Sequence, residues 1–273
     1  MSRFNLHLVS DATGETLTTI ANAAVVQFES AEPQKHLWPM IRSRAQVDTV
    51  LAGIEGAPGL VLYTVVNEET RAALEEGCRR LGVKHLSALD PVMMALREFL
   101  GQATTGRPGT QHEMNTEYFE RIEAMHYTLA HDDGQMADDL DRADIVLVGV
   151  SRSSKTPTSM YLANRGLKVA NVPFVPGVPL PDELFGLKYA MVIGLTTAPD
   201  RLSQIRRNRL LSLKETHSSD YADEEQVKEE LIEAKRLFAK QRWPVIDVTR
   251  KSIEETAAAI LSLYQRRRAE KQA

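Results

Sequence analysis

The hydrophobic pattern of the first hundred residues switches repeatedly between two periods. A continuous apolar run rich in β-branched residues, such as 59–66 (GLVLYTVV), indicates a buried strand. Apolar residues at three- and four-residue spacing indicate helices, and 67–82 begins at an Asn cap and closes at Gly82. We expect strands at 4–10, 36–41, 59–66 and 83–88 and helices at 14–30, 43–54, 67–82 and 90–101. This alternation predicts a mostly parallel sheet flanked by helices.

The pattern is interrupted near residue 101 and resumes near residue 143. The segment 101–111 (GQATTGRPGTQ) predicts a linker, and 115–131 predicts a helix that stops at the DDG turn, 132–134. We expect later strands at 144–150, 167–174, 189–197 and 243–249 and helices at 155–166, 199–213, 223–241 and 252–268. The fold class is therefore α/β, with a Rossmann-like domain over 1–100, a linker and connecting helix over 101–141, and a second α/β domain over 142–273.

Composition limits the class of protein. Of the 273 residues, 43% are hydrophobic, which is enough to bury a sizeable core. The net charge of −4 shows no basic surplus of the kind that nucleic-acid-binding proteins carry. The single cysteine, Cys78, excludes a disulfide framework, and no apolar run approaches the ~20 residues of a membrane span. We expect a cytoplasmic protein that binds neither nucleic acid nor membrane; a homodimer, the commonest soluble oligomer, is compatible with the sequence.

A loop-like stretch, 149–156 (GVSRSSKT), follows an apolar strand directly and opens the next helix. Its spacing is that of the phosphate-binding loop G-x-x-x-x-G-K-[ST], with Ser154 in place of the second glycine. In such a loop, backbone N–H groups and the helix N-terminus hold phosphates, a lysine reaches the outer phosphates, and a hydroxyl binds Mg²⁺. If the Ser154 position requires a positive φ, serine costs about 1 kcal/mol or more there. The pattern indicates a P-loop kinase-like nucleotide site, and a polar strand-to-helix turn is the alternative.

The candidate nucleotide contacts are all eight loop residues: Gly149, Val150, Ser151, Arg152, Ser153, Ser154, Lys155 and Thr156. An arginine-rich segment follows at 201–209, where the guanidinium groups could neutralise a phosphoryl group in transfer or could form a solvated helix face. The strand at 189–197 lacks the acid that usually ends the strand beside such a loop.

In the first domain, SDATGET (10–16) lies at a strand end, where Asp11, Thr13 and Gly14 are candidates for contact with an anion or a target protein. A polar turn before the first helix is the alternative reading of that loop.

Four stretches together carry a family resemblance: 149–176 (GVSRSSKTPTSMYLANRGLKVANVPFVP), 7–17 (HLVSDATGETL), 131–134 (HDDG) and 194–209 (GLTTAPDRLSQIRRNR). The chain resembles the bacterial and plastid regulatory proteins of pyruvate, phosphate dikinase and of phosphoenolpyruvate synthase. The loop of that family also has serine before the lysine. The resemblance implies a bifunctional enzyme that phosphorylates a Thr or Ser near the catalytic His of its target, with ADP as donor, and so inactivates the target. It also implies removal of that phosphate by inorganic phosphate, with release of pyrophosphate.

The resemblance assigns roles to several residues. Lys155 and the loop amides would hold the phosphates of ADP, and Thr156 or Ser151 would meet Mg²⁺. Asp132 and Asp133 are candidates for the base that takes the acceptor's proton, with Asp132 preferred and His131 able to orient or substitute. The residues expected to stabilise charge on the moving phosphoryl group are Arg206, Arg207 and Arg209.

Three alternatives remain open at this point. The target could be phosphoenolpyruvate synthase instead of the dikinase. The protein could be a P-loop kinase that uses ATP and a small-molecule acceptor. It could also be a nucleotide sensor that transfers no phosphate.

Overall fold

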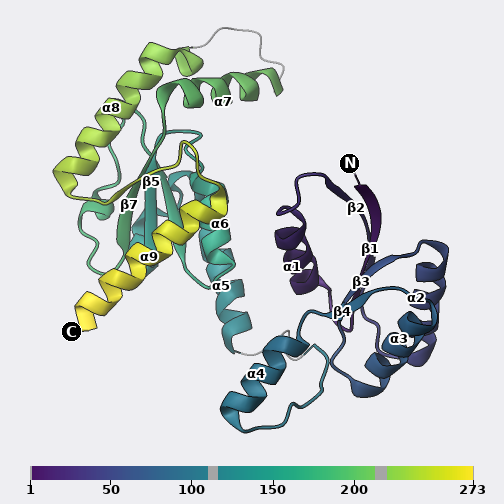
Figure 1. Ribbon diagram of the computed structural model, residues 1–273. Coiled ribbons are helices and arrows are strands. Elements are labelled where there is room, and N and C mark those ends of the chain that lie inside the picture. Colours follow the sequence, from purple (N-terminus) through teal and green to yellow (C-terminus); the bar gives the residue numbers. More distant parts are fainter. Residues whose placement is uncertain (1, 110–115, 213–219, 273) are drawn as a thin grey trace. The chain divides into compact units, whose positions relative to one another are not determined.

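The computed structural model describes residues 2–109, 116–212 and 220–272 and divides into two compact units, Met1–Glu113 and Met114–Ala273 (Figure 1). Within these described ranges each unit holds one four-stranded sheet whose strand pairs are all parallel. The predicted α/β class is therefore confirmed. The expected ends of the linker and of two helices, at residues 111, 115 and 213, lie outside the described residues.

The first unit arranges its strands in the order β2-β1-β3-β4. Its strands are β1 (Ser2–Ser10), β2 (Ala31–Trp38), β3 (Gly59–Thr64) and β4 (His85–Ser87), and its helices are α1 (Glu15–Val25), α2 (Arg44–Gly56), α3 (Glu68–Arg80) and α4 (Asp90–Leu100). Helix α1 packs Leu17 and Ala21 on one face of the sheet, and α2 and α3 cover the opposite face (Figure 1). Because β1 and β3 pair up to Ser10 and Thr64, the loops that follow them begin at the same edge.

The second unit arranges its strands in the order β6-β5-β7-β8. Its strands are β5 (Ile145–Gly149), β6 (Val169–Pro173), β7 (Met191–Thr196) and β8 (Val245–Asp247). Its helices are α5 (Thr116–Ala130), α6 (Lys155–Ala163), α7 (Pro199–Ser212), α8 (Glu224–Gln241) and α9 (Ile253–Gln272), with one-turn or short 3-10 helices η2 (Asp132–Gly134), η3 (Ala137–Arg142), η4 (Asp182–Phe185) and η5 (Asp220–Ala222). Gly149 pairs with Pro173 on one side and with Leu195 on the other, so the central strand β5 ends between its two neighbours.

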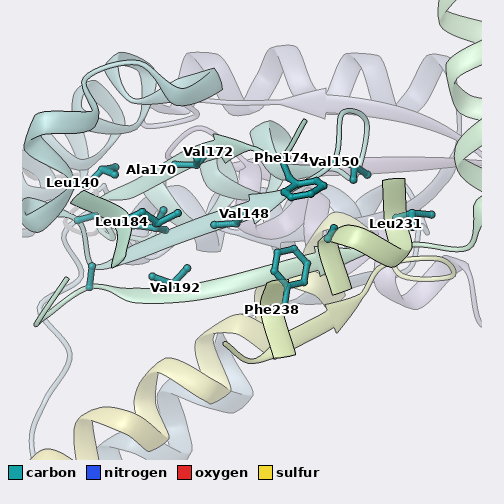
Figure 2. Close-up of a cluster of buried hydrophobic side chains, with 14 of the residues drawn as sticks. Leu140, Val148, Val150, Ala170, Val172, Phe174, Leu184, Val192, Leu231 and Phe238 are labelled. Atoms are coloured by element: carbon teal, nitrogen blue, oxygen red, sulfur yellow. The ribbon is translucent and has the colours of Figure 1, made fainter. Parts of the chain in front are cut away.

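The core of the second unit fills both faces of this sheet. On one face, Val148, Val172 and Val192 meet Leu231 and Phe238 of α8 (Figure 2). The opposite face packs against the apolar side of α6 and α9. Strand β5 is therefore buried on both faces, which explains its continuous apolar run and gives the loop after Gly149 a rigid base.

The prediction for the second strand was wrong at its start. The pattern favoured 36–41, whereas β2 begins at Ala31 and ends at Trp38. Residues 31–35 (AEPQK) contain three polar residues and Pro33, and this composition argues against a strand. Strand β2 lies at the edge of its sheet, so one of its sides has no neighbouring strand. Proline is tolerated there because its missing N–H costs no hydrogen bond on the open side, and polar side chains reach solvent.

Two local signals for helix starts are confirmed, whereas the first helix, expected over 14–30, ends at Val25. Ser252 and Glu255 form the expected capping box, with the Ser252 N–H donating to Glu255 Oε2 at 2.8 Å and the Glu255 N–H donating to Ser252 Oγ at 3.1 Å. Helix α7 begins at Pro199, as the first-turn preference of proline predicts. Across the described ranges, no helix combines the length and apolarity that crossing a bilayer would require.

Candidate functional site

The loop between β5 and α6 contains two residues with left-handed backbone conformations. Arg152 and Ser154 both adopt left-handed conformations, with φ of 69° and 64°. Ser154 is the residue immediately before α6, where the usual motif has glycine. The position therefore does require a positive φ, and serine occupies it at a cost of about 1 kcal/mol. Strain of this kind persists at functional sites, where the surrounding structure fixes the backbone.

Gly149 allows the loop to start close to the neighbouring strand. A Cβ at this position would lie 2.8 Å from the backbone oxygen of Leu195 and 2.8 Å from Ser153 Oγ. The Ser153 hydroxyl itself donates to the Val150 carbonyl at 2.9 Å, which closes the turn internally. A side chain at Gly149 would push apart the central strands or displace this serine, so glycine is required here for packing.

Lys155 lies folded across the loop. Its side chain is 5% exposed, and its ammonium group donates to the carbonyls of Gly149 at 2.8 Å and Val150 at 3.0 Å. Burial lowers the pKa of Lys155 to about 8, although the carboxylates of Asp133 and Asp132 act in the opposite direction. The ammonium group is thus still largely protonated at neutral pH and is held at the start of α6, beside the left-handed turn.

Asp132 meets the first turn of α6. The Thr156 hydroxyl donates to the Asp132 carboxylate at 2.9 and 3.2 Å, and the side-chain amide of Asn171 donates to the same carboxylate. Asp133, by contrast, is exposed and adopts a φ of 51°. Of the two acids considered as the base, the structure brings Asp132 into hydrogen-bond contact with the loop's Thr156.

His131 belongs to the support of this turn. It is 3% exposed, stacks on the Tyr127 ring with centroids 3.7 Å apart, and has Nδ1 2.8 Å from the Tyr127 carbonyl. Its Nε2 lies 3.8 Å from Asp139 Oδ2. An orienting role through the backbone fits this geometry, because the His131 carbonyl accepts the Asn171 N–H at 2.9 Å.

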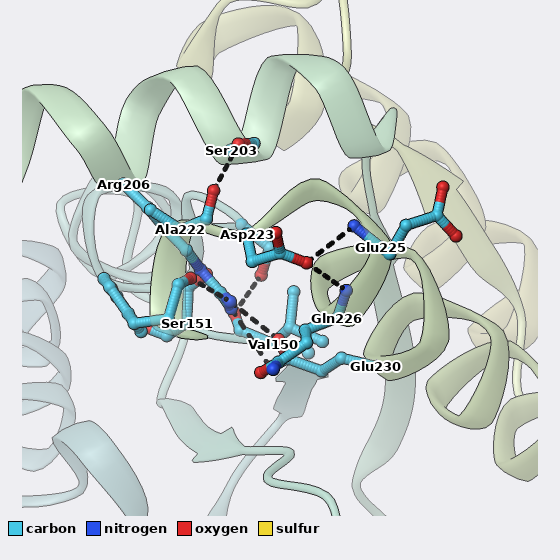
Figure 3. A network of polar contacts seen from close by, with 12 residues as sticks. Val150, Ser151, Ser203, Arg206, Ala222, Asp223, Glu225, Gln226 and Glu230 are labelled. Carbon is cyan, nitrogen blue, oxygen red and sulfur yellow. Dashed lines mark hydrogen bonds and ion pairs between the residues drawn. The ribbon is translucent and has the colours of Figure 1, made fainter. Parts of the chain in front are cut away.

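Arg206 holds the outer side of the loop (Figure 3). Its guanidinium forms a two-pronged ion pair with Glu230, at 2.7 and 3.0 Å, and donates to the Ser151 carbonyl at 3.1 Å. It also donates to the Tyr221 carbonyl at 3.0 Å and lies over the Tyr221 ring, whose hydroxyl is 2.9 Å from Ser151 Oγ. Arg206 is therefore buried and paired, whereas Arg207 and Arg209 are exposed on α7. A catalytic role for the three arginines stays a prediction.

The ion pair allows a stability test. Changing Glu230 to glutamine leaves the buried Arg206 charge without its anion, so we expect the second unit to lose about 2–4 kcal/mol of unfolding free energy. Urea unfolding can be followed through Trp243 in a Trp38→Phe background, since the chain has two tryptophans and these lie in different units. The matched control is Glu229→Gln, which removes an exposed charge on the same helix. Equal stabilities for the two variants would contradict a structural role for the pair.

The SDATGET loop of the first unit is held mainly from within. The Asp11 carboxylate is 3% exposed and accepts the Val66 N–H at 2.7 Å, while Arg42 donates to the Asp11 backbone carbonyl at 2.7 Å. Burial raises the pKa of Asp11, and the Val66 hydrogen bond and the Arg42 charge act against that rise. The side chain of Asp11 thus links two strand ends. A contact of this loop with an anion or target, with Thr13 and Gly14 included, stays a prediction.

A family model described as kinase/pyrophosphorylase matches residues 6–261. The chain belongs to the kinase/pyrophosphorylase family. A relative from Rhizorhabdus wittichii is 55% identical over 273 residues, and the match covers 100% of this chain and 100% of the relative. Relatives from Caulobacter vibrioides (55% identical, covering 95% of this chain and 82% of the relative) and Paramagnetospirillum magneticum (56%, covering 97% and 86%) are similarly close. All three are provisionally named pyruvate, phosphate dikinase regulatory protein, so the resemblance seen in the sequence motifs is confirmed.

Three residues of this candidate site are not predicted by the sequence. Asn171, Tyr221 and Glu230 each contact the loop or its partners, and none was a candidate. Asn171 could have been found, because an amide inside the otherwise apolar strand 169–172 (VANV) is costly unless something bonds it. Glu230 resembles the other acids of α8, and its pairing with Arg206 depends on tertiary packing that the sequence does not display.

Proposed function

We propose that this protein is a bifunctional serine/threonine kinase and phosphorylase that regulates pyruvate, phosphate dikinase. In one direction it transfers the β-phosphoryl group of ADP to a Thr or Ser hydroxyl near the catalytic His of the dikinase, which inactivates the target. In the other direction it removes that group with inorganic phosphate and releases pyrophosphate. The family and the names of the relatives support this target and a phosphotransferase activity.

The observation that carries the proposal is the juxtaposition of Lys155, the left-handed turn and Asp132 at the end of β5. A diphosphate needs N–H donors and a cation, and the loop from Val150 to Thr156 supplies both at a helix N-terminus. The Lys155 ammonium now bonds two carbonyls and could exchange them for phosphate oxygens. An acceptor hydroxyl needs a base at the same place, and Asp132 contacts the adjacent Thr156.

In the kinase direction, the acceptor oxygen forms a bond to the β-phosphorus of ADP, and the bond from that phosphorus to the bridging oxygen breaks, which leaves AMP. Asp132 accepts the hydroxyl proton as the new bond forms. Lys155 balances negative charge on the phosphoryl oxygens, and exposed Arg207 and Arg209 are available to neutralise charge from the α7 side.

In the reverse direction, an oxygen of inorganic phosphate bonds to the phosphorus of the phosphorylated residue. The bond to the side-chain oxygen breaks, Asp132 passes the proton of the attacking hydrogen phosphate to that oxygen, and pyrophosphate is the product. Asp132 therefore starts as a carboxylate in both directions, so a single acid–base group can serve both reactions.

Magnesium fits the oxygen ligands that are present. The Thr156 hydroxyl is a hard oxygen donor in the first turn of α6, and Mg²⁺ typically combines one or two protein ligands with phosphate oxygens and water. Bound there, Mg²⁺ would neutralise charge on the diphosphate. Ser151 offers a second hydroxyl, although it is engaged with the Tyr221 hydroxyl.

The test is incubation of the purified protein with ADP labelled in the β-phosphate and with purified dikinase. We expect label on a Thr or Ser of the dikinase, AMP as co-product, and release of labelled pyrophosphate when inorganic phosphate is then added. Label on phosphoenolpyruvate synthase alone would show that the synthase, and not the dikinase, is the target. Turnover of a small acceptor with ATP would indicate a metabolite kinase. Nucleotide binding without transfer to any acceptor would refute the proposal in favour of a sensor.

A further inference from the structure

Asn171 is a polar residue inside a buried strand. It is the central residue of β6, is 1% exposed, and has the fully buried Val169 two positions before it on the same face. An amide taken out of water costs roughly 1–3 kcal/mol in proteins unless hydrogen bonds replace the lost hydration. The fold therefore retains Asn171 here only because its side chain has specific partners.

Those partners are the two groups that the proposed chemistry requires. The Asn171 amide nitrogen donates to Asp132 Oδ1 and, at 2.9 Å, to Thr156 Oγ1. The Thr156 hydroxyl donates in turn to the Asp132 carboxylate. Three separate elements, η2, α6 and β6, thus contribute one side chain each to a closed set of hydrogen bonds.

The direction of the amide follows from this set. A carboxylate only accepts hydrogen bonds, so the nitrogen of Asn171, and not its oxygen, must face Asp132. The Asn171 oxygen is buried without a hydrogen-bond partner in the described part of the chain. Keeping an unpartnered oxygen in order to direct two N–H bonds at Asp132 and Thr156 is a cost that packing alone does not explain.

We propose that Asn171 is a positioning residue for phosphoryl transfer, which holds the Asp132 carboxylate against the first turn of α6. The inference rests on the proposed function. Asp132 begins a one-turn helix whose next two residues, Asp133 and Gly134, both have positive φ, so its own backbone restrains it weakly. The sheet supplies the restraint twice, because the Asn171 N–H also donates to the His131 carbonyl at 2.9 Å. If Thr156 turns towards a metal ion, Asn171 still keeps its bond to Asp132.

Removal of the amide is expected to change kcat and to leave binding in place. In Asn171→Ala we expect kcat for transfer to the dikinase to fall by about 10–100-fold, the range seen when residues that orient a reactive group are removed. The KM for ADP should stay within about twofold, because within the described residues Asn171 bonds the loop at the Thr156 hydroxyl alone, and the Lys155 ammonium bonds other groups. Asn171→Asp keeps the size but replaces two donors with an acceptor, so it should lose at least as much kcat. Urea unfolding of both variants identifies one that folds poorly, and the cycle below then decides the role of Asn171.

A double-mutant cycle separates positioning from general structural support. If Asn171 acts through Asp132, adding Asn171→Ala to Asp132→Asn should lower kcat by less than about twofold further. A structural role would instead make the two losses multiply. The matched control is Asn164→Ala, which removes an exposed asparagine just after α6, the helix that contains Thr156. This variant should leave kcat unchanged.

Each outcome decides the inference. Wild-type kcat in both Asn171 variants, a loss confined to KM, or multiplicative losses in the cycle would overturn it while the proposed function stands. Absence of transfer by the wild-type protein to any acceptor would overturn the proposed function, and the inference with it. A large kcat loss that disappears in the Asp132→Asn background would support both.

Discussion

Replacing Lys155 with alanine is expected to reduce ADP-dependent transfer to the dikinase by at least about 10³-fold while the second unit stays folded. The loop would lose its buried cation, and the remaining backbone donors cannot balance the charge that develops on the phosphoryl oxygens. Folding should survive because burial disfavours the charged form of Lys155, as its lowered pKa of about 8 indicates. The measurement is label transfer from β-labelled ADP at saturating nucleotide and Mg²⁺, with urea unfolding of the same samples.

Two further variants make this test of the loop decisive. Lys155→Met fills the same volume without the charge and should be as inactive as the alanine variant. Lys240→Ala removes an exposed lysine from the last turn of α8 and should keep full activity. Activity near the wild-type level in both Lys155 variants would remove the loop from the mechanism and leave only the family membership.

The loop is also where sequence and structure agree most closely. Its place between a buried strand and a helix could be predicted because both flanks have strong local patterns: a run of five buried residues at 145–149 and a helix that starts at Lys155. The question raised by Ser154 could be stated from the sequence but not answered. Only the backbone shows that serine occupies a left-handed position, with φ of 64°, and so keeps the geometry of the usual glycine.

Residues that act through pairing were harder to predict. Arg206 was grouped with Arg207 and Arg209 because the three are neighbours in sequence, yet helical geometry turns Arg206 inward to Glu230 and leaves the other two exposed. Glu230 lies 24 residues away, and nothing in its local sequence distinguishes it from the exposed acids of α8. Similarly, the edge position of β2 decides whether Pro33 is tolerated in a strand, and strand order is not visible in the polarity of 31–35. Local patterns therefore define elements, whereas partners and edges depend on topology.

The choice between the two adjacent acids shows what the structure adds to the sequence. Both belong to the HDDG motif, and turn chemistry alone treats them alike. The 3-10 turn after α5 directs Asp132 to Thr156 and places Asp133 in an exposed, left-handed position. Asp133 nevertheless contributes to the field at Lys155, since its charge opposes the lowering of the lysine's pKa. The two acids should therefore differ in the kind of effect that their loss produces, as well as in its size.

Asp132→Asn is expected to lower kcat for transfer by about 10²–10⁴-fold, whereas Asp133→Asn should lower it by less than about threefold. Asparagine keeps the shape of the aspartate and can still accept the Thr156 hydrogen bond, but it cannot take the acceptor's proton. Single-turnover transfer at saturating ADP measures the chemical step, and calorimetric ADP binding by each variant checks that the nucleotide site is intact. If high Mg²⁺ restores the kcat of Asp132→Asn, Asp132 acts through the metal ion. If Asp133→Asn loses more kcat than Asp132→Asn, Asp133 is the base. With neither result, the carboxylate that Asn171 and Thr156 hold is the group that moves the proton.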